Sequence, residues 1–121
     1  MKYRLMDILA CPMCKSFPLK LAVYEMREIT APPNIRQCEF FCGYHGGFVK
    51  NLSSTECMKC YGLEVSTGLL ECGSCGRWYP IIEDIPRMLP DDLRDSNLDR
   101  SFVEQWQHML PKHILKSFRI E

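Results

Sequence analysis

The amino-acid sequence predicts an α+β protein with a small antiparallel sheet, an N-terminal helix, a Cys-rich central insert and a helical C-terminal tail. Three observations lead to this prediction. Pairs of cysteines have the spacing of metal ligands, short apolar runs flank two of these pairs, and the residues after position 90 carry apolar side chains at helical spacing. A chain of 121 residues with this pattern fits one modest domain, or a small domain that carries an insertion.

The first expected element is a short helix that ends before Cys11. Its apolar positions are Leu5, Met6, Ile8 and Leu9. A strand is expected over residues 19–24, and the segment TAPPN at 30–34 breaks regular structure. The segment GLLECGSCGRWYPI predicts a strand, a tight turn and a second strand, in which Gly76 takes a positive φ at the end of the turn.

Eight cysteines in a chain of this length indicate disulfides or bound metal. Three pairs have the spacing C-x2-C and one has C-x3-C; the pairs are Cys11–Cys14, Cys38–Cys42, Cys57–Cys60 and Cys72–Cys75. A tight turn with such a pair presents two thiolates to one side, and two turns complete the tetrahedral shell of zinc. Disulfides between cysteines three residues apart are strained, so the spacing favours metal.

The order of the pairs along the chain indicates which of them share an ion. Four cysteines lie together in the central insert, which leaves Cys11, Cys14, Cys72 and Cys75 to form one site. Four thiolates leave no open position for water, so this site would hold a structural zinc ion in a zinc ribbon. Zinc would supply much of the stability of so small a ribbon. A redox pair and simply buried thiols are the alternatives at this site.

The central cysteines allow more than one interpretation. Cys38, Cys42, Cys57 and Cys60 have workable spacing for a second structural zinc ion. Disulfides and free thiols stay open as alternatives. Cys42 is followed by a glycine, as expected in a zinc-binding turn, and His45 could replace Cys38 or Cys42 as a ligand.

Charge and hydropathy exclude several classes of protein. Fifteen Lys and Arg balance fifteen Asp and Glu, so the chain lacks the basic excess of a free-standing nucleic-acid binder. Asp7 interrupts the N-terminal apolar run, which is too short and polar for a signal peptide, and no apolar run is long enough to span a membrane. We therefore expect a cytoplasmic protein. Because no nucleophile, base or carboxylate arrangement for catalysis is evident, we expect no enzymatic activity of the chain itself.

The residues after position 90 predict a helix, with Ser96 and Asp99 placed as a capping box. Its apolar positions, spaced for one helix face, are Leu98, Phe102, Val103, Trp106, Met109 and Leu110. Pro111 should end this helix or begin another that carries Ile114, Leu115 and Phe118. The helix would pack on its own ribbon or dock on a partner. The expected organisation is a zinc-ribbon domain over 1–24 and 67–90, a Cys-rich insert over 25–66 and a helical extension over 91–121.

The segment that follows Cys75 is strongly apolar, whereas zinc modules that read nucleic acid continue there with basic residues. A strand buries alternate side chains in its own domain, so the remaining ones would be exposed in a monomer. Exposed apolar patches mark interaction sites, and we expect this segment to bind a partner protein. The candidate partner-binding residues are Arg77, Trp78, Tyr79, Pro80, Ile81, Ile82, Ile85, Pro86, Met88 and Leu89.

Two blocks of the sequence, LMDILACPMCK and GLLECGSCGRWYPIIEDIPRML, resemble the small zinc-ribbon activator subunit of methyltransferases in archaea and eukaryotes. Short bacterial proteins are similar to the same two blocks. The resemblance covers Tyr3–Leu21 and Gly68–Leu89. The chain departs from the family in three places: Asp84 stands where a glycine precedes Ile-Pro, the insert is Cys-rich, and residues 91–121 extend beyond the usual end. Because Asp tolerates a left-handed backbone, we expect the turn at Asp84 to survive.

The resemblance implies a non-catalytic subunit that activates and stabilises an S-adenosylmethionine-dependent methyltransferase as a heterodimer. The enzyme would modify tRNA, at guanosine, or a translation release factor or rRNA. In the family, an edge strand of the zinc domain lies beside the enzyme's sheet and covers an apolar surface. S-adenosylmethionine and tRNA would bind only through the partner. The alternative is a free-standing zinc-ribbon module that binds RNA or a transcription or translation assembly directly, through scattered cations such as Arg27 and Arg36. A redox or metal-carrier protein is a third class.

Overall fold

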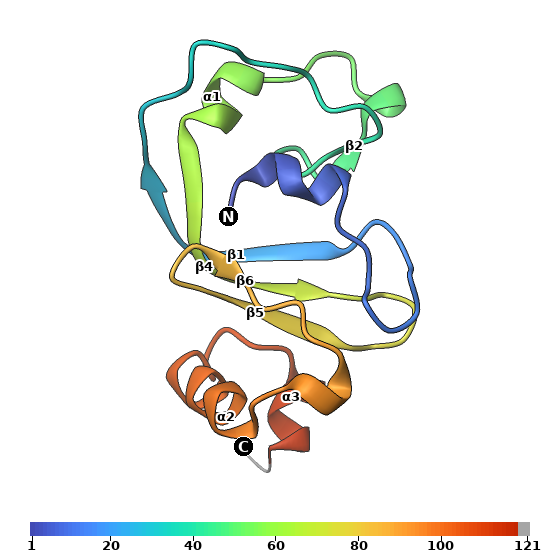
Figure 1. Ribbon diagram of the computed structural model, residues 1–121, viewed down its shortest axis with the longest axis vertical. Helices are drawn as coiled ribbons and strands as arrows, with labels where there is room; N and C mark the ends of the chain where they lie inside the picture. Colours follow the sequence, from blue (N-terminus) through green and yellow to red (C-terminus); the bar gives the residue numbers. More distant parts are fainter. Residues whose placement is uncertain (119–121) are drawn as a thin grey trace. The chain divides into compact units, whose positions relative to one another are not determined.

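The computed structural model describes residues 1–118, which fall into two compact units: residues 1–88 and the residues from 89 onward. The first unit contains the main sheet, the N-terminal helix and the insert, and the second contains two α-helices (Figure 1). Helices combine with an antiparallel sheet and with a cysteine cluster typical of a zinc ribbon, and the C-terminal tail is helical. These features confirm the predicted fold class.

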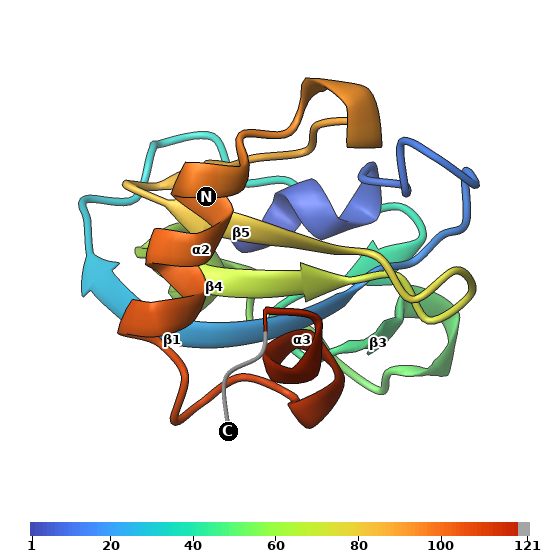
Figure 2. The same cartoon turned by 90° about the horizontal axis from the view of Figure 1, so that it is seen from below.

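Four antiparallel strands form the main sheet of the first unit, in the order β1-β4-β5-β6. Their bounds are β1 Lys20–Glu28, β4 Leu63–Glu71, β5 Trp78–Ile82 and β6 Ile85–Pro86. Figure 2 shows β1, β4 and β5 side by side. The pairing of β1 with β4 runs from Lys20 opposite Glu71 to Glu28 opposite Leu63. Because β1 pairs along the whole of β4, it extends four residues beyond the predicted end at residue 24.

Strands β5 and β6 form a tight hairpin. Alternation along β5 directs Tyr79 and Ile81 into the core of the first unit, where both are fully buried. Glu83 and Asp84 join the strands with φ values of 50° and 69°. Two positive φ values indicate a type I′ turn, whose twist matches that of a hairpin. The expected left-handed backbone at Asp84 is therefore present, and the Asp84 carboxylate also pairs with the guanidinium of Arg27 on β1.

The N-terminal helix is a 3₁₀-helix, η1 (Tyr3–Asp7), which packs against β4, β2 and α1 of the same unit (Figure 1). With three residues per turn, Tyr3 and Met6 share one face, and both are buried. Ile8 lies past the end of η1 and is 72% exposed. The helix is thus present as expected, but its buried face is Tyr3 and Met6 rather than a face that includes Ile8.

Met1 connects η1 to two parts of the sheet. Its amino group donates to Glu64 Oε1 at 2.8 Å and to the carbonyl oxygens of Val65 and Asp84 at 2.7 and 2.6 Å. Glu64 also pairs with Lys2 at 2.6 Å. These bonds fix the start of η1 on the sheet, and so they set where Asp7 lies at its other end.

The insert contains small elements: β2 Phe41–Cys42, β3 Gly47–Phe48, η2 Val49–Asn51 and α1 Cys57–Tyr61. Strands β2 and β3 pair as a hairpin. The Asp7 carboxylate accepts the backbone N–H groups of Glu39, Phe40 and Phe41 at 2.8–3.0 Å. Burial alone would raise the pKa of Asp7, but these three bonds bring it below its usual value. A charged carboxylate therefore holds the start of the insert on η1.

The second unit contains η3 Asp91–Leu93, α2 Ser96–Gln105 and α3 Lys112–Ser117. Asp95 caps α2, because its carboxylate accepts the N–H groups of Asn97 and Leu98 at 2.9 and 3.2 Å. The predicted capping box of Ser96 and Asp99 is therefore wrong, and Asp99 pairs with Arg94 at 2.9 Å. Pro111 directly precedes α3, as expected for a proline that begins a helix. Residues 119–121 of the predicted extension lie outside the described residues.

Candidate metal centre

The first cysteine pair, Cys11 and Cys14, lies in a tight turn between η1 and β1. The Cys11 N–H donates to the Ser16 carbonyl at 3.0 Å, and the Lys15 N–H donates to the Cys11 carbonyl at 2.8 Å. Lys15 leaves the turn with a φ of 67°. A lysine in this left-handed region is strained, because its Cβ crowds the backbone there.

The second pair, Cys72 and Cys75, lies in a turn of the same kind between β4 and β5. The Cys72 N–H donates to the Arg77 carbonyl at 2.8 Å, and the Gly76 N–H donates to the Cys72 carbonyl at 3.0 Å. Gly76 has a φ of 77°, which confirms the predicted positive φ. The two turns match bond for bond, so Lys15 occupies the place in the first turn that Gly76 occupies in the second.

The fold brings the two turns together. Their four sulfur atoms, from Cys11, Cys14, Cys72 and Cys75, all lie within 4.8 Å of one another. The Sγ atoms of Cys11 and Cys75 are 3.6 Å apart, and those of Cys14 and Cys72 are 3.4 Å apart. Sulfur atoms at about 2.3 Å from a zinc ion stand about 3.8 Å apart at the corners of a tetrahedron. The quartet therefore has the donor atoms and the size of a zinc site.

An ion held by this quartet would have a structural role. Four thiolates complete the shell of zinc, so neither water nor substrate would find an open position. The ion would join the loop after η1 to the loop between β4 and β5. It would thus connect the first residues of the chain to the centre of the sheet.

Hydrogen bonds around the quartet favour thiolates at two of its positions. Burial opposes ionisation of Cys11, but hydrogen bonds from Tyr79 and from the N–H groups of Cys14 and Met13 bring its pKa to about 6. Hydrogen bonds with Ser16 lower the pKa of Cys14, whereas burial raises the pKa of Cys72. The thiolate is the form that binds metal, so these hydrogen bonds favour the metal-binding form of Cys11 and Cys14.

Tyr79 belongs to this site, although its sequence position suggested a contact with a partner. It is fully buried, and its hydroxyl oxygen lies 3.1 Å from Cys11 Sγ. Neighbours that hydrogen bond to metal ligands orient them and tune affinity. Strand alternation indicates that Tyr79 points inward, but no sequence signal pairs it with a cysteine 68 residues away.

The central cysteines lie around a separate cavity, which all four of Cys38, Cys42, Cys57 and Cys60 line. They stand farther apart than the outer four: among residues 1–118, the outer quartet alone has its sulfur atoms all within 4.8 Å. Burial raises the pKa of Cys38 and of Cys60 to about 11. Within the described residues, all eight cysteines are free thiols. His45 is not among the residues that line the cavity, and its Nε2 accepts the N–H of Glu56 at 3.3 Å.

One local expectation for the central pairs is wrong. Cys57 and Cys60 lie on a helix, α1, instead of in a tight turn. Gly43, which follows Cys42, does not have a positive φ. It is required by close packing, because a Cβ at this position would lie 2.5 Å from the carbonyl oxygen of Tyr3.

The candidate partner-binding residues divide between the interior and the surface. Tyr79, Pro80 and Ile81 are buried, whereas Ile85 and Leu89 are 53% and 40% exposed. The others are half-buried: Arg77, Trp78, Ile82, Pro86 and Met88. Because β6 is an outermost strand of the sheet, Ile85 lies at an edge.

In the part of the chain that the structure describes, no helix is both long enough and apolar enough to cross a membrane.

Comparison with known proteins identifies the family of this chain. A search of curated proteins finds no match. A family model described as Trm112p-like protein matches residues 2–84, a range that includes both turns of the outer quartet and the whole insert. The chain therefore belongs to the Trm112p-like family, whose members are non-catalytic subunits that activate methyltransferases.

Proposed function

We propose that this chain activates and stabilises an S-adenosylmethionine-dependent methyltransferase that modifies tRNA at guanosine, and that further partners methylate a translation release factor or rRNA. Family membership supports the non-catalytic role. In this proposal the chain forms a heterodimer in the cytoplasm, and S-adenosylmethionine and tRNA bind through the enzyme. Residues 1–24 and 67–90 act as the zinc ribbon that binds the enzyme, and 25–66 and 91–121 act as its insert and extension.

The observation that carries the proposal is the outer edge of β6. This strand is the last of the sheet, and its inner side pairs with β5. The Arg87 N–H also points inward, because it donates to the Pro80 carbonyl at 2.8 Å. Backbone groups alternate between the two sides of an extended chain, so the carbonyl of Pro86 and the backbone groups of Met88 point outward.

An edge with outward backbone groups can accept a further strand. Ile85 is 53% exposed at this edge and offers an apolar contact. Pro86 has no N–H to donate, which limits indiscriminate pairing with other edges. A partner strand would be aligned by backbone hydrogen bonds and selected by side chains at alternate positions.

Activation follows if the chain binds the folded enzyme and not the unfolded one. Such binding stabilises the native state by mass action, by about 2.7 kcal/mol when the subunit is present at about 100 times its Kd. Covering an apolar surface of the enzyme would keep it soluble and order its methyl-donor site. The subunit would thus raise activity without contacting the substrate.

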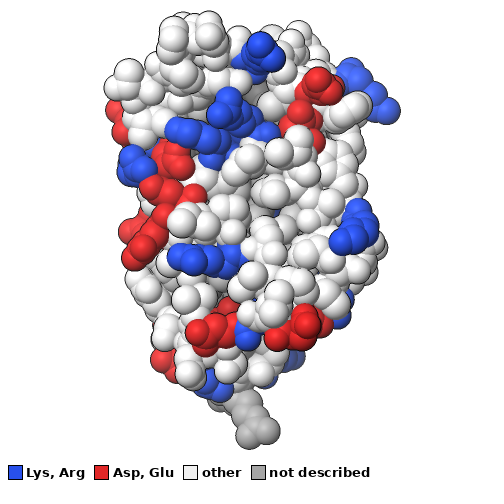
Figure 3. All heavy atoms as spheres, viewed as in Figure 1, with Lys and Arg blue, Asp and Glu red and all other residues white. Residues whose placement is uncertain are grey.

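The distribution of charge gives little support to direct RNA binding. On the face shown in Figure 3, Lys and Arg side chains are interspersed with Asp and Glu. Several cations of the described chain are already in ion pairs, among them Arg27 with Asp84 and Lys2 with Glu64. A phosphate-binding surface gathers its cations in a patch or stripe. Direct RNA binding is therefore an outcome that the experiment below must distinguish.

The experiment is a high-salt pull-down from native lysate with three tagged chains: wild type, Ile85→Asp and Ile8→Asp. Both isoleucines are exposed, by 53% and 72%, but only Ile85 lies at the β6 edge. We expect wild type and Ile8→Asp to retain a methyltransferase in stoichiometric amount, and Ile85→Asp to retain roughly 10-fold less or lower still. The retained enzyme is then assayed on tRNA, release factor and rRNA.

Equal zinc content in the three chains would show that the substitutions leave the fold intact. Retention of the methyltransferase by Ile85→Asp at the wild-type level would move the interface away from β6. Retention of RNA or a ribosomal assembly in place of an enzyme, with release as salt rises, would contradict the activator proposal.

A further inference from the structure

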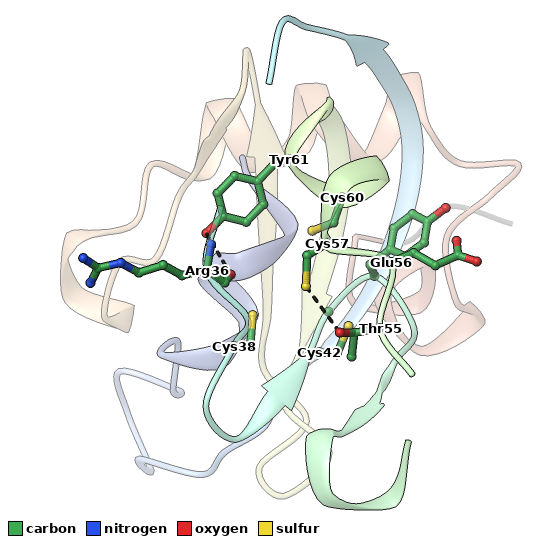
Figure 4. A pocket seen from close by; sticks show the side chains of 10 residues that line it. Arg36, Cys38, Cys42, Thr55, Glu56, Cys57, Cys60 and Tyr61 are labelled. Carbon is green, nitrogen blue, oxygen red and sulfur yellow. Dashed lines mark hydrogen bonds between the residues drawn. The ribbon is translucent and has the colours of Figure 1, made fainter. Parts of the chain in front are cut away.

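The insert brings a second set of four cysteines together from separate segments. Cys38 and Cys42 lie before and in β2, and Cys57 and Cys60 lie on α1. All four line one cavity, and Figure 4 shows their thiols directed toward a common space. None of these residues belongs to the outer quartet.

Helix α1 presents one of the two pairs. Residues three apart on a helix are neighbours, so Cys57 and Cys60 project from one side of α1. The Cys57 thiol lies 3.4 Å from Thr55 Oγ1, as the dashed line in Figure 4 shows, and Cys60 is buried. Glu56, just before α1, donates its N–H to His45 Nε2 in the β2–β3 turn. A hydrogen bond that uses no cysteine therefore ties this pair to the hairpin that carries Cys42.

Asp7 and Gly43 hold the other pair on η1. The Asp7 carboxylate accepts all three backbone N–H groups between Cys38 and Cys42 at 2.8–3.0 Å. Gly43 packs so closely on η1 that an added Cβ would lie 2.5 Å from a carbonyl oxygen and 2.7 Å from Met6 Cγ. The Cys38–Cys42 loop is thus fixed at its centre and at its end.

The cavity has room for a single ion. Its volume is about 10 Å³, close to the roughly 10–15 Å³ that a single water molecule requires. An organic ligand would not fit among the four thiols. A metal ion fits, and thiolates are the donors that select zinc.

One cation would offset part of the double negative charge of a zinc ion with four thiolates. Arg4 is close enough to favour negative charge on Cys38 and Cys60, whereas the Arg36 guanidinium points away from the four thiols in Figure 4. The Arg4 guanidinium is held over the Tyr61 ring, 5.0 Å from its centre. The Tyr61 hydroxyl in turn donates to the Arg36 carbonyl at 3.0 Å, so one buried tyrosine contacts both Arg4 and the backbone just before Cys38.

We propose that Cys38, Cys42, Cys57 and Cys60 bind a second structural zinc ion. The thiols release their protons to solvent as Zn²⁺ binds, and four thiolates close a tetrahedral shell. Because these sulfur atoms stand wider apart than those of the outer quartet, they move inward on binding, and the site has the lower affinity of the two. The ion joins the β2–β3 hairpin to α1 and so stabilises an insert whose strands are only two residues long.

The zinc content of the purified full-length chain tests this proposal. Elemental analysis and native mass spectrometry should find two zinc ions in wild type and one in Cys38→Ser and in Cys60→Ser. Met58→Ser is the matched control, since Met58 lies on the same helix as Cys60 but is 71% exposed and does not line the cavity; it should keep two. With Co²⁺ in place of zinc, the sulfur-to-cobalt absorbance of wild type should be about twice that of Cys60→Ser.

One zinc ion in wild type, with the four central thiols open to alkylation in the native protein, would overturn the proposal. Disulfides among these cysteines, seen as a loss of two hydrogens per bridge in the intact mass, would overturn it equally. The number of zinc ions per wild-type chain tests the proposal even if the Cys60→Ser chain fails to fold. No methyltransferase takes part in these measurements, so their outcome is independent of the proposed function.

Discussion

The two cysteine quartets show two ways to bring four thiols together. In the outer quartet each pair sits in a turn closed by two backbone hydrogen bonds, and one turn joins the paired strands β4 and β5. Its closest sulfur atoms are 3.4 and 3.6 Å apart. In the central quartet, a loop held by Asp7 faces a short helix, and the sulfur atoms stand wider apart. Strand pairing brings the outer four sulfur atoms together without an ion, whereas the proposed zinc ion would have to draw the central four sulfur atoms together.

The largest expected effect comes from breaking the outer quartet. Structural zinc contributes about 10–16 kcal/mol of apparent binding energy in small domains, and whole domains are stable by only about 5–15 kcal/mol. Cys72→Ser should therefore unfold the ribbon and abolish partner binding, because serine supplies no thiolate. Cys60→Ser should cost the insert its ion but leave the sheet folded. Circular dichroism during thermal unfolding, with zinc content, measures both.

Two results would contradict the different roles assigned here to the two quartets. A soluble Cys72→Ser chain that keeps its zinc and melts as wild type does would remove Cys72 from the metal site. A Cys60→Ser chain that loses its β-sheet signal as completely as Cys72→Ser would show that the ribbon depends on both quartets equally.

A smaller effect is expected where the central quartet packs on η1. Gly43→Ala would place a Cβ 2.5 Å from the Tyr3 carbonyl oxygen and 2.7 Å from Met6 Cγ. Because a backbone oxygen and a buried side chain cannot give way without moving η1, we expect a loss of about 1–3 kcal/mol in the free energy of unfolding. The central zinc should also be lost more readily to a chelator.

Gly73→Ala, in the second turn of the outer quartet, is the control for this substitution. A Cβ there meets only the end of the Lys20 side chain, with Cε at 3.5 Å, so the change should cost little. Urea unfolding gives the free energies for the two variants. Equal losses would mean that the contact with η1 does not hold the central loop.

The turns of the outer quartet could be predicted from the sequence more completely than the contacts that hold the central quartet. The difference is that the former are local in sequence and the latter are not. The positive φ of Gly76 follows from a turn that is complete within six residues, so a local pattern was enough. Asp7 interrupts an apolar run, and nothing near it in sequence indicates that its partners are residues 39–41. Tyr79 and Cys11, whose side chains are in contact, are likewise far apart in the sequence. Contacts that form only when the chain has folded are the ones that sequence patterns leave undetermined.

The same distinction explains the helices and strands. Residues 25–28 are mostly polar and carry a weak strand signal, yet they are in β1 because β4 pairs with them. The capping of α2 by Asp95 is local, but two neighbouring residues, Asp95 and Ser96, are both good caps, and the pattern does not choose between them. The fold class was predictable because it depends on cysteine spacing and on strands that alternate, which many residues specify together.

The smallest expected effect compares the two turns of the outer quartet with each other. Lys15 and Gly76 occupy the same place, with φ values of 67° and 77°. In this left-handed region the steric clash of a Cβ destabilises the folded chain by about 1–2 kcal/mol. Glycine avoids the clash but loses more conformational entropy on folding, which offsets about 0.5–1 kcal/mol of the gain. Lys15→Gly should therefore stabilise the chain by about 0.5 kcal/mol and raise its Tm by about 2–4 °C, even though an exposed bond from Lys15 to the Pro12 carbonyl is lost.

Gly76→Ala is the matched reverse change, because a Cβ at Gly76 meets no atom within 4 Å and only its φ decides the effect. By the same reasoning, with the steric cost partly offset by the lower chain entropy of alanine, it should lower the free energy of unfolding by about 0.5 kcal/mol. Thermal unfolding of both variants with zinc in excess gives the comparison directly. A lower Tm in both variants would mean that the two turns differ in strain although they share the same two backbone hydrogen bonds, because a contact that glycine cannot make relieves the strain at Lys15.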